Sequence, residues 1–238
     1  MKKKIIPKHY TCYRTSKPIA INAILDKPVW KKAPVLDKWS ITVDKKKLYK
    51  SATFPTIAKM CWDKDNLYIA FECIDRDIKA IRTKKDSDVW QDDAFEIFID
   101  PLGDGKRYVE IEVNPLNTQL DLLIEPSAKK IWTESAKFDV VGLKTAVRIF
   151  GTINYDCDED EKWAGEIMIP WQSFKKAVNT KKIALPPKDG DIWRIGFFRS
   201  ECGNKIKGIS QEWNSWSPTK TNHTPSQFGY ITFSKKTL

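Results

Sequence analysis

The chain has 238 residues, of which 41% are hydrophobic, and a formal net charge of +10. This length suits one all-β domain, and the hydrophobic fraction suffices for a sizeable core. With 10 Gly and 13 Pro, collagen-like and low-complexity sequences are excluded. No apolar run is long enough to form a membrane-spanning helix, so we expect no membrane partner.

The positive charge comes from lysine rather than arginine. The chain has 34 Lys and 7 Arg, although specific readout of phosphates or bases favours the rigid fork of Arg. The Lys pairs are scattered, and no zinc-finger, RNA-recognition or helix-turn-helix pattern accompanies them. The charge therefore predicts a solvated, Lys-rich surface and no nucleic-acid partner.

Alternation of apolar and polar residues with a period of two predicts strands along most of the chain. The expected strands, in chain order, are residues 56–62, 67–74, 94–100, 107–114, 119–125, 147–153, 163–169, 192–199 and 228–233. Helix is scarce, and residues 171–178 are the best candidate. Because strands and helices do not alternate, the pattern predicts an all-β fold, namely a single antiparallel, jelly-roll-like β-sandwich of about ten strands.

The sequence predicts a short lead-in followed by one domain. We expect residues 1–15 to be irregular, residues 16–238 to form the β-sandwich domain, and residues 235–238 to fray. Residues 2–4 (KKK) lack a following apolar segment, so we expect no export signal in the chain as written, although a trimmed mature chain would look the same. The cysteines never form a CxxC pair, and one disulfide stays open among Cys12, Cys61, Cys73, Cys157 and Cys202.

Several segments share a pattern with a known family. They are residues 19–30 (IAINAILDKPVW), 88–101 (DVWQDDAFEIFIDP) and 161–171 (EKWAGEIMIPW), followed by 191–199, 216–219 and 225–233. In this order and spacing they resemble carbohydrate-binding module family 9. Asn22 and Ala23 stand where the family usually has Asp and Gly, which predicts a slightly different turn there.

The resemblance implies a non-catalytic module of xylanases and related enzymes, or a free-standing relative, that supports polysaccharide breakdown. Such modules bind cellulose- or xylan-type chains, often at the reducing end, and hold the sugar between two Trp side chains. The resemblance also associates structural calcium with the fold. Asp75 and Asp77, or the acidic run 156–160, could hold calcium, and an acidic turn without metal is the alternative.

Ten Trp residues are an unusual excess, which predicts a heavy core or a binding surface. Five lie in apolar patterns and are predicted core residues: Trp30, Trp62, Trp163, Trp171 and Trp193. Trp90 follows a polar segment, and Trp213 and Trp216 lie in a loop-like polar stretch, so we expect these three to stack on sugar rings. Trp216 fits the second clamp position of the family better than Trp213. Trp90 and Trp216 are therefore expected to face each other across a slot one sugar ring wide.

A polar floor for the sugar hydroxyls is predicted beside these Trp residues. Glu96 alternates with apolar neighbours, so it is expected on the more open face of its strand. Glu112 and Asn114 alternate in the same way, and Arg199 closes a later strand. Carboxylates, amides and Arg form directional hydrogen bonds with hydroxyls, and cross-strand salt bridges are the alternative interpretation.

Two other functional classes stay open. A glycoside hydrolase needs two carboxylates at a set separation, for which Glu96 with Glu112 or Glu166 can be considered. With only His9 and His223, a His-dependent triad or metal site has little support. A protein-interaction sandwich is the second alternative. We expect no catalytic residue, no required cofactor and a monomer that binds an oligo- or polysaccharide.

Overall fold

The computed structural model describes residues 5–42, 46–125, 137–175, 177, 182–203, 208 and 211–238. The strands within them are β1 (His9–Arg14), β2 (Ser40–Thr42), β3 (Thr56–Trp62), β4 (Asn66–Ile74), β5 (Ala94–Asp100), β6 (Tyr108–Val113), β7 (Gln119–Ile124), β8 (Lys144–Phe150), β9 (Lys162–Pro170), β10 (Ile192–Glu201), β11 (Glu212–Ser215) and β12 (Gly229–Thr237). The described helices are α1 (Pro28–Lys32) and the 3₁₀ turns η1 (Val89–Gln91), η2 (Trp171–Lys175) and η3 (Pro225–Gln227). No helix among the described residues is long and apolar enough to cross a membrane.

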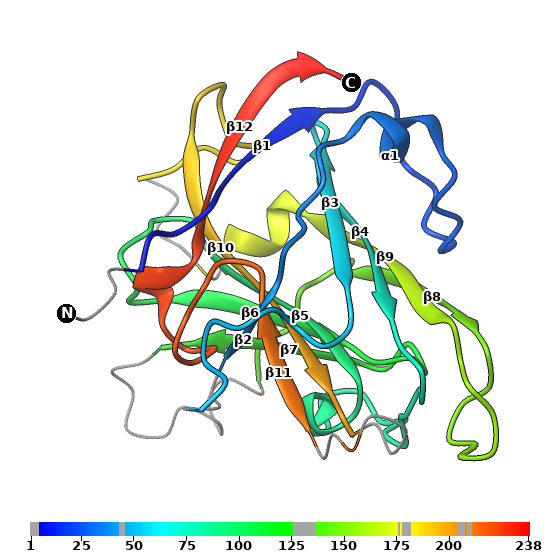
Figure 1. The fold of residues 1–238 in the computed structure, drawn as a ribbon. Coiled ribbons are helices and arrows are strands. Elements are labelled where there is room, and N and C mark those ends of the chain that lie inside the picture. The colour runs from blue at the N-terminus through cyan, green and yellow to red at the C-terminus, as the bar shows by residue number, and fades with distance from the viewer. Residues whose placement is uncertain are drawn as a thin grey trace.

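These strands join one mixed sheet that curls strongly on itself (Figure 1). Its main path runs β7-β6-β5-β10-β12-β1-β3-β4-β9-β8, and β11 pairs with β10 and β2 beside it. β1 lies between β12 and β3 and is parallel to both. The all-β prediction with little helix is confirmed. A single antiparallel sandwich is not, because β1 joins the two ends of the chain through parallel pairing.

The two halves of the curled sheet pack face to face around an aromatic core. Phe71 of β4 stacks on Phe95 of β5 with ring centroids 4.1 Å apart, and Trp163 of β9 meets Phe71 edge-on. The five Trp residues predicted to be core are all buried, with at most 2% of their surface exposed: Trp30, Trp62, Trp163, Trp171 and Trp193. This part of the sequence prediction is confirmed.

The opposite face of β5 is also covered. Ala94 and Phe98 pack there with Tyr108, Phe198 and other residues in a second apolar cluster. Every residue of β5 is buried, including Glu96 with 1% of its surface exposed. Glu96 thus lies opposite the main core, on the face that the alternation predicts, but it is buried there, because a period of two shows which face a residue takes and not what covers that face.

Some predicted loops are strands. Residues 9–14, expected to be irregular, form β1, and residues 235–237, expected to fray, belong to β12. Residues 212–215, expected to be loop-like, form β11. The partners of these short strands lie far away along the chain, so local periodicity does not reveal them. The helix predicted over residues 171–178 is the shorter η2, and residues 176 and 178 lie outside the described part.

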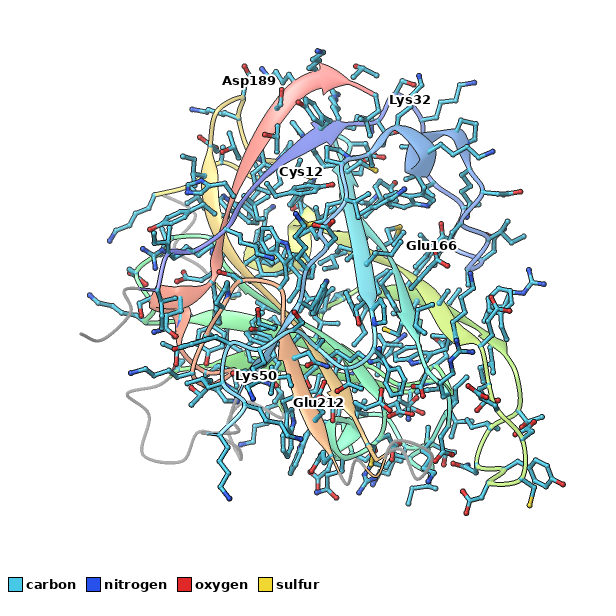
Figure 2. The ribbon with its side chains drawn as sticks, viewed as in Figure 1. Cys12, Lys32, Lys50, Glu166, Asp189 and Glu212 are labelled. Atoms are coloured by element: carbon cyan, nitrogen blue, oxygen red, sulfur yellow. The ribbon has the colours of Figure 1, made fainter. Side chains whose placement is uncertain are left out.

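Glu166 of β9 holds the N-terminal segment on the sheet (Figure 2). Its carboxylate accepts hydrogen bonds of 2.6–2.9 Å from the N–H groups of Asn22 and Ala23, from Lys27 Nζ and from Trp30 Nε1. Ala23 has a φ of +56°, in the left-handed region that favours Gly. The absence of Gly at this position therefore does not remove the left-handed turn.

Candidate functional site

A cavity of about 280 Å³ opens over β5 and β6, on the face opposite the main core. It is lined by aromatic rings, carboxyl groups and a polar loop: Trp90, Glu96, Phe98, Glu110, Glu112, Trp213, Thr221, Asn222 and His223. This volume is close to the lower end of the ~300–1,000 Å³ range of small-molecule pockets, which share this mixture of apolar walls and few polar groups. Among the residues predicted to bind sugar, Trp90, Trp213, Glu96 and Glu112 line the cavity.

Trp90 forms one wall and is held by the two aspartates that follow it. The side chain of Trp90 on η1 is 36% exposed. Asp92 and Asp93 accept hydrogen bonds of 2.6–3.1 Å from the backbone N–H groups of residues 79, 81 and 82. The indole is therefore accessible while its backbone is anchored to a neighbouring segment.

Trp213 forms another wall, on β11. It pairs in register with Ser200 of β10, which shares a strand face with Phe198. Phe198 in turn pairs with Glu96 of β5, so Trp213 and Glu96 lie on the same side of the sheet. Trp213 is only partly buried. Two Trp side chains from distant segments therefore contact one cavity.

Three glutamates form the polar floor. Glu96 of β5 pairs with Glu112 of β6, and Phe98 pairs with Glu110 one step along the same face. Each glutamate is at most 2% exposed. Each also has one buried oxygen without a hydrogen-bond partner among the described residues: Glu96 Oε1, Glu110 Oε2 and Glu112 Oε2. Because such atoms are costly to bury alone, this floor suits donors that a ligand supplies.

Burial raises the pKa of all three carboxyl groups. Burial and the charge of Glu110 raise the pKa of Glu96 to about 8, and burial raises the pKa of Glu110 to about 7. Burial, with the charges of Glu96 and Glu110, raises the pKa of Glu112 well above its usual value. Near neutral pH the three groups therefore share protons, so the floor donates as well as accepts hydrogen bonds.

Residues 221–223 form the rim. Asn222 Nδ2 donates to Glu96 Oε2 at 3.2 Å, and Asn222 Oδ1 is buried without a hydrogen-bond partner in the described part of the chain. His223 Nδ1 lies 2.9 Å from the Tyr108 hydroxyl and 4.0 Å from Glu110 Oε2. Burial lowers the pKa of His223, so its ring is uncharged at neutral pH. The rim thus adds an amide oxygen and an imidazole to the carboxyl floor.

Trp216 is a core residue and not a wall of this cavity. It is 3% exposed and packs edge-on against Phe197, with ring centroids 6.2 Å apart. Gly229 makes room for it, since a Cβ at this glycine would lie 2.2 Å from the indole. Trp213 and Trp216 are three residues apart, so extended backbone directs them to opposite faces. The predicted Trp90–Trp216 slot is therefore wrong, and Trp213 lies where the second wall was expected.

Asn114 supports the cavity without lining it. Its Nδ2 donates to Asp92 Oδ2 and to the Arg82 carbonyl, both at 2.9 Å, and its Oδ1 accepts from the Thr118 N–H at 2.8 Å. All of its polar atoms are thus engaged within the protein. Asn114 fixes the segment that carries Trp90, and the prediction that it belongs to the polar floor is not supported by its position.

Arg199 lies on the other face of the sheet. It pairs in register with Phe95, which belongs to the main core. Its Nη1 donates to the Ile74 carbonyl at 2.8 Å, and its Nη2 lies 3.1 Å from Asp75 Oδ2 and also contacts Glu201. Arg199 is fully buried, so the prediction that it forms part of the polar floor is wrong.

We call Arg199, Asp75, Asp93 and Glu201 the Arg199 cluster. Ligand atoms of its three acidic residues lie within 4.8 Å of one another, and each residue is at most 1% exposed. Glu201 Oε1 has no hydrogen-bond partner among the described residues. Three carboxylates and one guanidinium leave two formal negative charges, which fits a divalent cation with oxygen ligands.

The other predicted calcium ligands are engaged elsewhere. Asp77 Oδ2 pairs with Lys79 Nζ at 3.0 Å. In the acidic run 156–160, Asp160 accepts hydrogen bonds of 2.7 Å from the N–H groups of Ile78 and Thr152. Among the described residues, only the Arg199 cluster brings three possible ligands together.

Sequence reasoning missed several lining residues. Glu110 belongs to the same alternation as Glu112, two residues away on the same face, so the signal for it was present. Asn222 and His223 carry no such signal, because the loop reaches the cavity only through the folded sheet. Asp93 and Glu201 of the Arg199 cluster were likewise hidden, since Asp93 precedes β5 and Glu201 ends β10, and only the folded sheet brings them to Asp75.

The sequence model of the family described as "Carbohydrate family 9 binding domain-like" matches residues 21–236. The chain belongs to this family. No curated protein matches the chain in sequence.

Three solved structures have a fold similar to that of this chain. A family 9 carbohydrate-binding module from Caldicellulosiruptor kristjanssonii in complex with cellotriose is 17% identical, with 96% of this chain and 95% of that chain covered and a TM-score of 0.62. The glucose complex of a module from the same organism is 18% identical, with coverages of 95% and 96% and a TM-score of 0.60. A proposed carbohydrate-binding protein from Bacteroides uniformis ATCC 8492 is 18% identical, with coverages of 96% and 100% and a TM-score of 0.68. At this identity the likeness establishes the fold.

Proposed function

We propose that this protein binds the end of an oligo- or polysaccharide chain in the cavity between Trp90 and Trp213, without catalysing a reaction. The observation that carries the proposal is that both indoles line one cavity whose floor is formed by three buried carboxyl groups. Membership of a carbohydrate-binding family supports it. The structural neighbours solved with cellotriose and glucose favour a β-glucan-type ligand, with xylan as the second candidate.

The physical basis is the two-sided character of a sugar ring. The C–H faces of a pyranose pack on flat aromatic surfaces, while its equatorial hydroxyls need directional partners. Trp90 and Trp213 supply aromatic area, and Glu96, Glu110 and Glu112 supply donors and acceptors. A cavity of about 280 Å³ with two Trp walls accommodates a terminal unit more easily than the interior of a long chain.

A titration tests this function. Trp fluorescence and calorimetry with glucose, cellotriose and xylotriose should show saturable binding by the parent protein. Trp90→Ala and Trp213→Ala should each weaken binding about tenfold, since one aromatic wall contributes about 1–2 kcal/mol. Tyr155→Ala is the matched control, because this aromatic side chain is 55% exposed and lies outside the cavity. Unchanged affinity in both wall variants would contradict the proposal and favour a protein-interaction sandwich.

The proposal includes the absence of hydrolase activity in the chain by itself. Glu166, one carboxylate considered as a partner for Glu96, already accepts four hydrogen bonds from the N-terminal segment. Incubation with xylan and β-glucan should therefore release no reducing ends. Release that disappears in Glu96→Gln would establish an enzyme instead.

We further propose that structural calcium is held by Asp75, Asp93 and Glu201 of the Arg199 cluster. Burial raises the pKa of Asp75, and burial with the charge of Asp75 raises the pKa of Asp93 well above its usual value. Burial also raises the pKa of Glu201 to about 8. These shifts express the cost of three adjacent buried charges, which a divalent cation would offset.

A further inference from the structure

The charge of the cavity is opposite to that of the whole protein. The chain carries a formal net charge of +10. Among the described residues, no Lys or Arg lines the cavity, whereas three glutamates do. The titratable side chains at the floor and rim are Glu96 of β5, Glu110, Glu112 and Tyr108 of β6, and His223. The cavity is therefore a local acidic site in a basic protein.

The buried polar atoms on the floor of the cavity that have no partner in the described chain are oxygens, so they need hydrogen-bond donors from a ligand. Each glutamate keeps one buried oxygen that no described residue contacts by a hydrogen bond, and the amide oxygen of Asn222 adds another. A sugar hydroxyl brings one donor and no charge. A protonated amino group brings three donors and the positive charge that a set of buried carboxylates requires. A cationic ligand therefore complements the floor of the cavity best.

The walls suit the same ligand. Trp is the aromatic side chain that attracts cations most strongly over its ring face, and both Trp90 and Trp213 line the cavity, with Phe98 on the floor. Aromatic walls around an acidic floor favour a cationic group while they still stack on the C–H face of a sugar.

Building on the proposed function, we propose that this cavity prefers sugars with a protonated amino group, such as glucosamine units, to neutral sugars and that it rejects uronic acids. A carboxylated sugar would add a negative charge to a floor that has no facing Lys or Arg in the described chain. A neutral sugar brings no positive charge, so the three carboxyl groups keep the protons that their raised pKa values hold and gain no ion pair with the ligand.

The raised pKa values of Glu96, Glu110 and Glu112 give this preference a second signature. A bound ammonium group favours the ionised carboxylates and lowers their pKa. Carboxyl protons therefore pass to the buffer when an amino sugar binds, and fewer pass when a neutral sugar binds. The observed heat of binding should then vary with the ionisation heat of the buffer more strongly for amino sugars than for neutral sugars.

Calorimetric titration of the full chain near pH 6.5, where ordinary amines are protonated, tests the preference. The probes are glucose, glucosamine, N-acetylglucosamine and glucuronic acid. The acetylated sugar has a substituent at the same carbon without the charge, so it separates charge from size. Glucosamine should bind about tenfold or more tightly than glucose and N-acetylglucosamine, with proton release, and glucuronic acid should bind most weakly. Equal or weaker binding of glucosamine would overturn the proposal.

The double variant Glu110→Gln with Glu112→Gln links the preference to the floor. The ratio of glucosamine to glucose affinity should fall toward one, and proton release should decrease to the part that Glu96 contributes. Glu125→Gln, which removes a carboxylate outside the cavity, should keep the parent's ratio. Glucose binding that depends on Trp213 but shows no amino preference would refute only this inference. Absence of binding by every sugar would refute the proposed function as well.

Discussion

The two faces of β5 and β10 bury acidic groups in different ways. On the core face, Arg199 stands among Asp75, Asp93 and Glu201 and bonds directly to two of them. On the opposite face, Glu96, Glu110 and Glu112 lie together beside a cavity, and the described lining includes no Lys or Arg. Both sets of carboxyl groups are almost fully buried. They differ in that an Arg lies among the carboxyl groups on the core face, whereas no Lys or Arg of the described residues lines the cavity.

This difference separates a structural role from a binding role. A cluster that contains its own guanidinium ties β10 to the end of β4 and is part of the folded architecture. The glutamates beside the cavity have no Lys or Arg among the described lining residues, and their unpartnered oxygens lie where the donors of a ligand could reach them. Binding sites such as the cavity floor are places where a protein loses some stability in exchange for function. Substitutions on the two faces should therefore affect different quantities.

The largest effect is expected for Arg199→Met. This change leaves three buried carboxyl groups without their internal cation, which should lower the free energy of unfolding by about 3–5 kcal/mol. Urea unfolding followed by Trp fluorescence measures it. Arg194→Met on the same strand is the matched control, since Arg194 is only partly buried. Glu110→Gln on the cavity face should be neutral or stabilising. If Arg199→Met and Arg194→Met cost the same, the contrast between the faces is lost.

Trp216→Ala should have a loss of similar size. Its indole packs against Phe197 in the main core and against Gly229, so truncation leaves a cavity and should cost about 3–5 kcal/mol of unfolding free energy. Trp213→Ala, three residues earlier, removes a partly exposed wall and should cost clearly less. Thermal unfolding of both variants provides the comparison. A larger loss for Trp213→Ala would reverse the assignment of the two indoles to core and wall.

Trp213 and Trp216 illustrate which structural features the sequence predicts and which it does not. The all-β fold, most strands and the five core Trp residues follow from local alternation, because burial on one face repeats with the period of the strand. The assignment of Trp216 to the site fails because the short β11 was expected to be a loop. Its partners, β10 and β2, are set by tertiary pairing. The prediction for Arg199 fails for a related reason. The sequence shows a charged residue near a strand end, but it does not show which buried carboxyl groups the folded chain brings next to it.

Calcium should raise the stability of the protein through the Arg199 cluster on the core face and not through the glutamates of the cavity. If Asp75, Asp93 and Glu201 bind the ion, excess calcium should stabilise the protein by about 3 kcal/mol when it exceeds the dissociation constant a hundredfold. The melting temperature should rise with calcium and fall with EDTA. Asp93→Asn should lose most of this response, whereas Glu112→Gln on the cavity face should keep it. A melting curve that neither calcium nor EDTA changes would remove the ion from the Arg199 cluster.

The smallest of these effects is the pH dependence of stability that Glu96 adds. Burial and the charge of Glu110 raise its pKa from 4.5 to about 8, so the folded protein holds a proton that the unfolded chain releases. Stability from this group is complete below pH 4.5 and is lost as the pH rises toward 8. Glu96→Gln cannot lose a proton, and it also removes a charge that raises the pKa of Glu112.

Between about pH 6 and pH 8, the parent should therefore lose about 2 kcal/mol more unfolding free energy than Glu96→Gln. Urea unfolding at several pH values measures both slopes. Glu201, whose pKa of about 8 has the same sign of effect, is present in both proteins and cancels in the difference. Glu72→Gln, at a partly exposed carboxylate outside the cavity, should follow the parent. Parallel slopes for the parent and Glu96→Gln would mean that Glu96 is ionised in the folded protein as it is in the unfolded chain, so the floor would hold no shared proton.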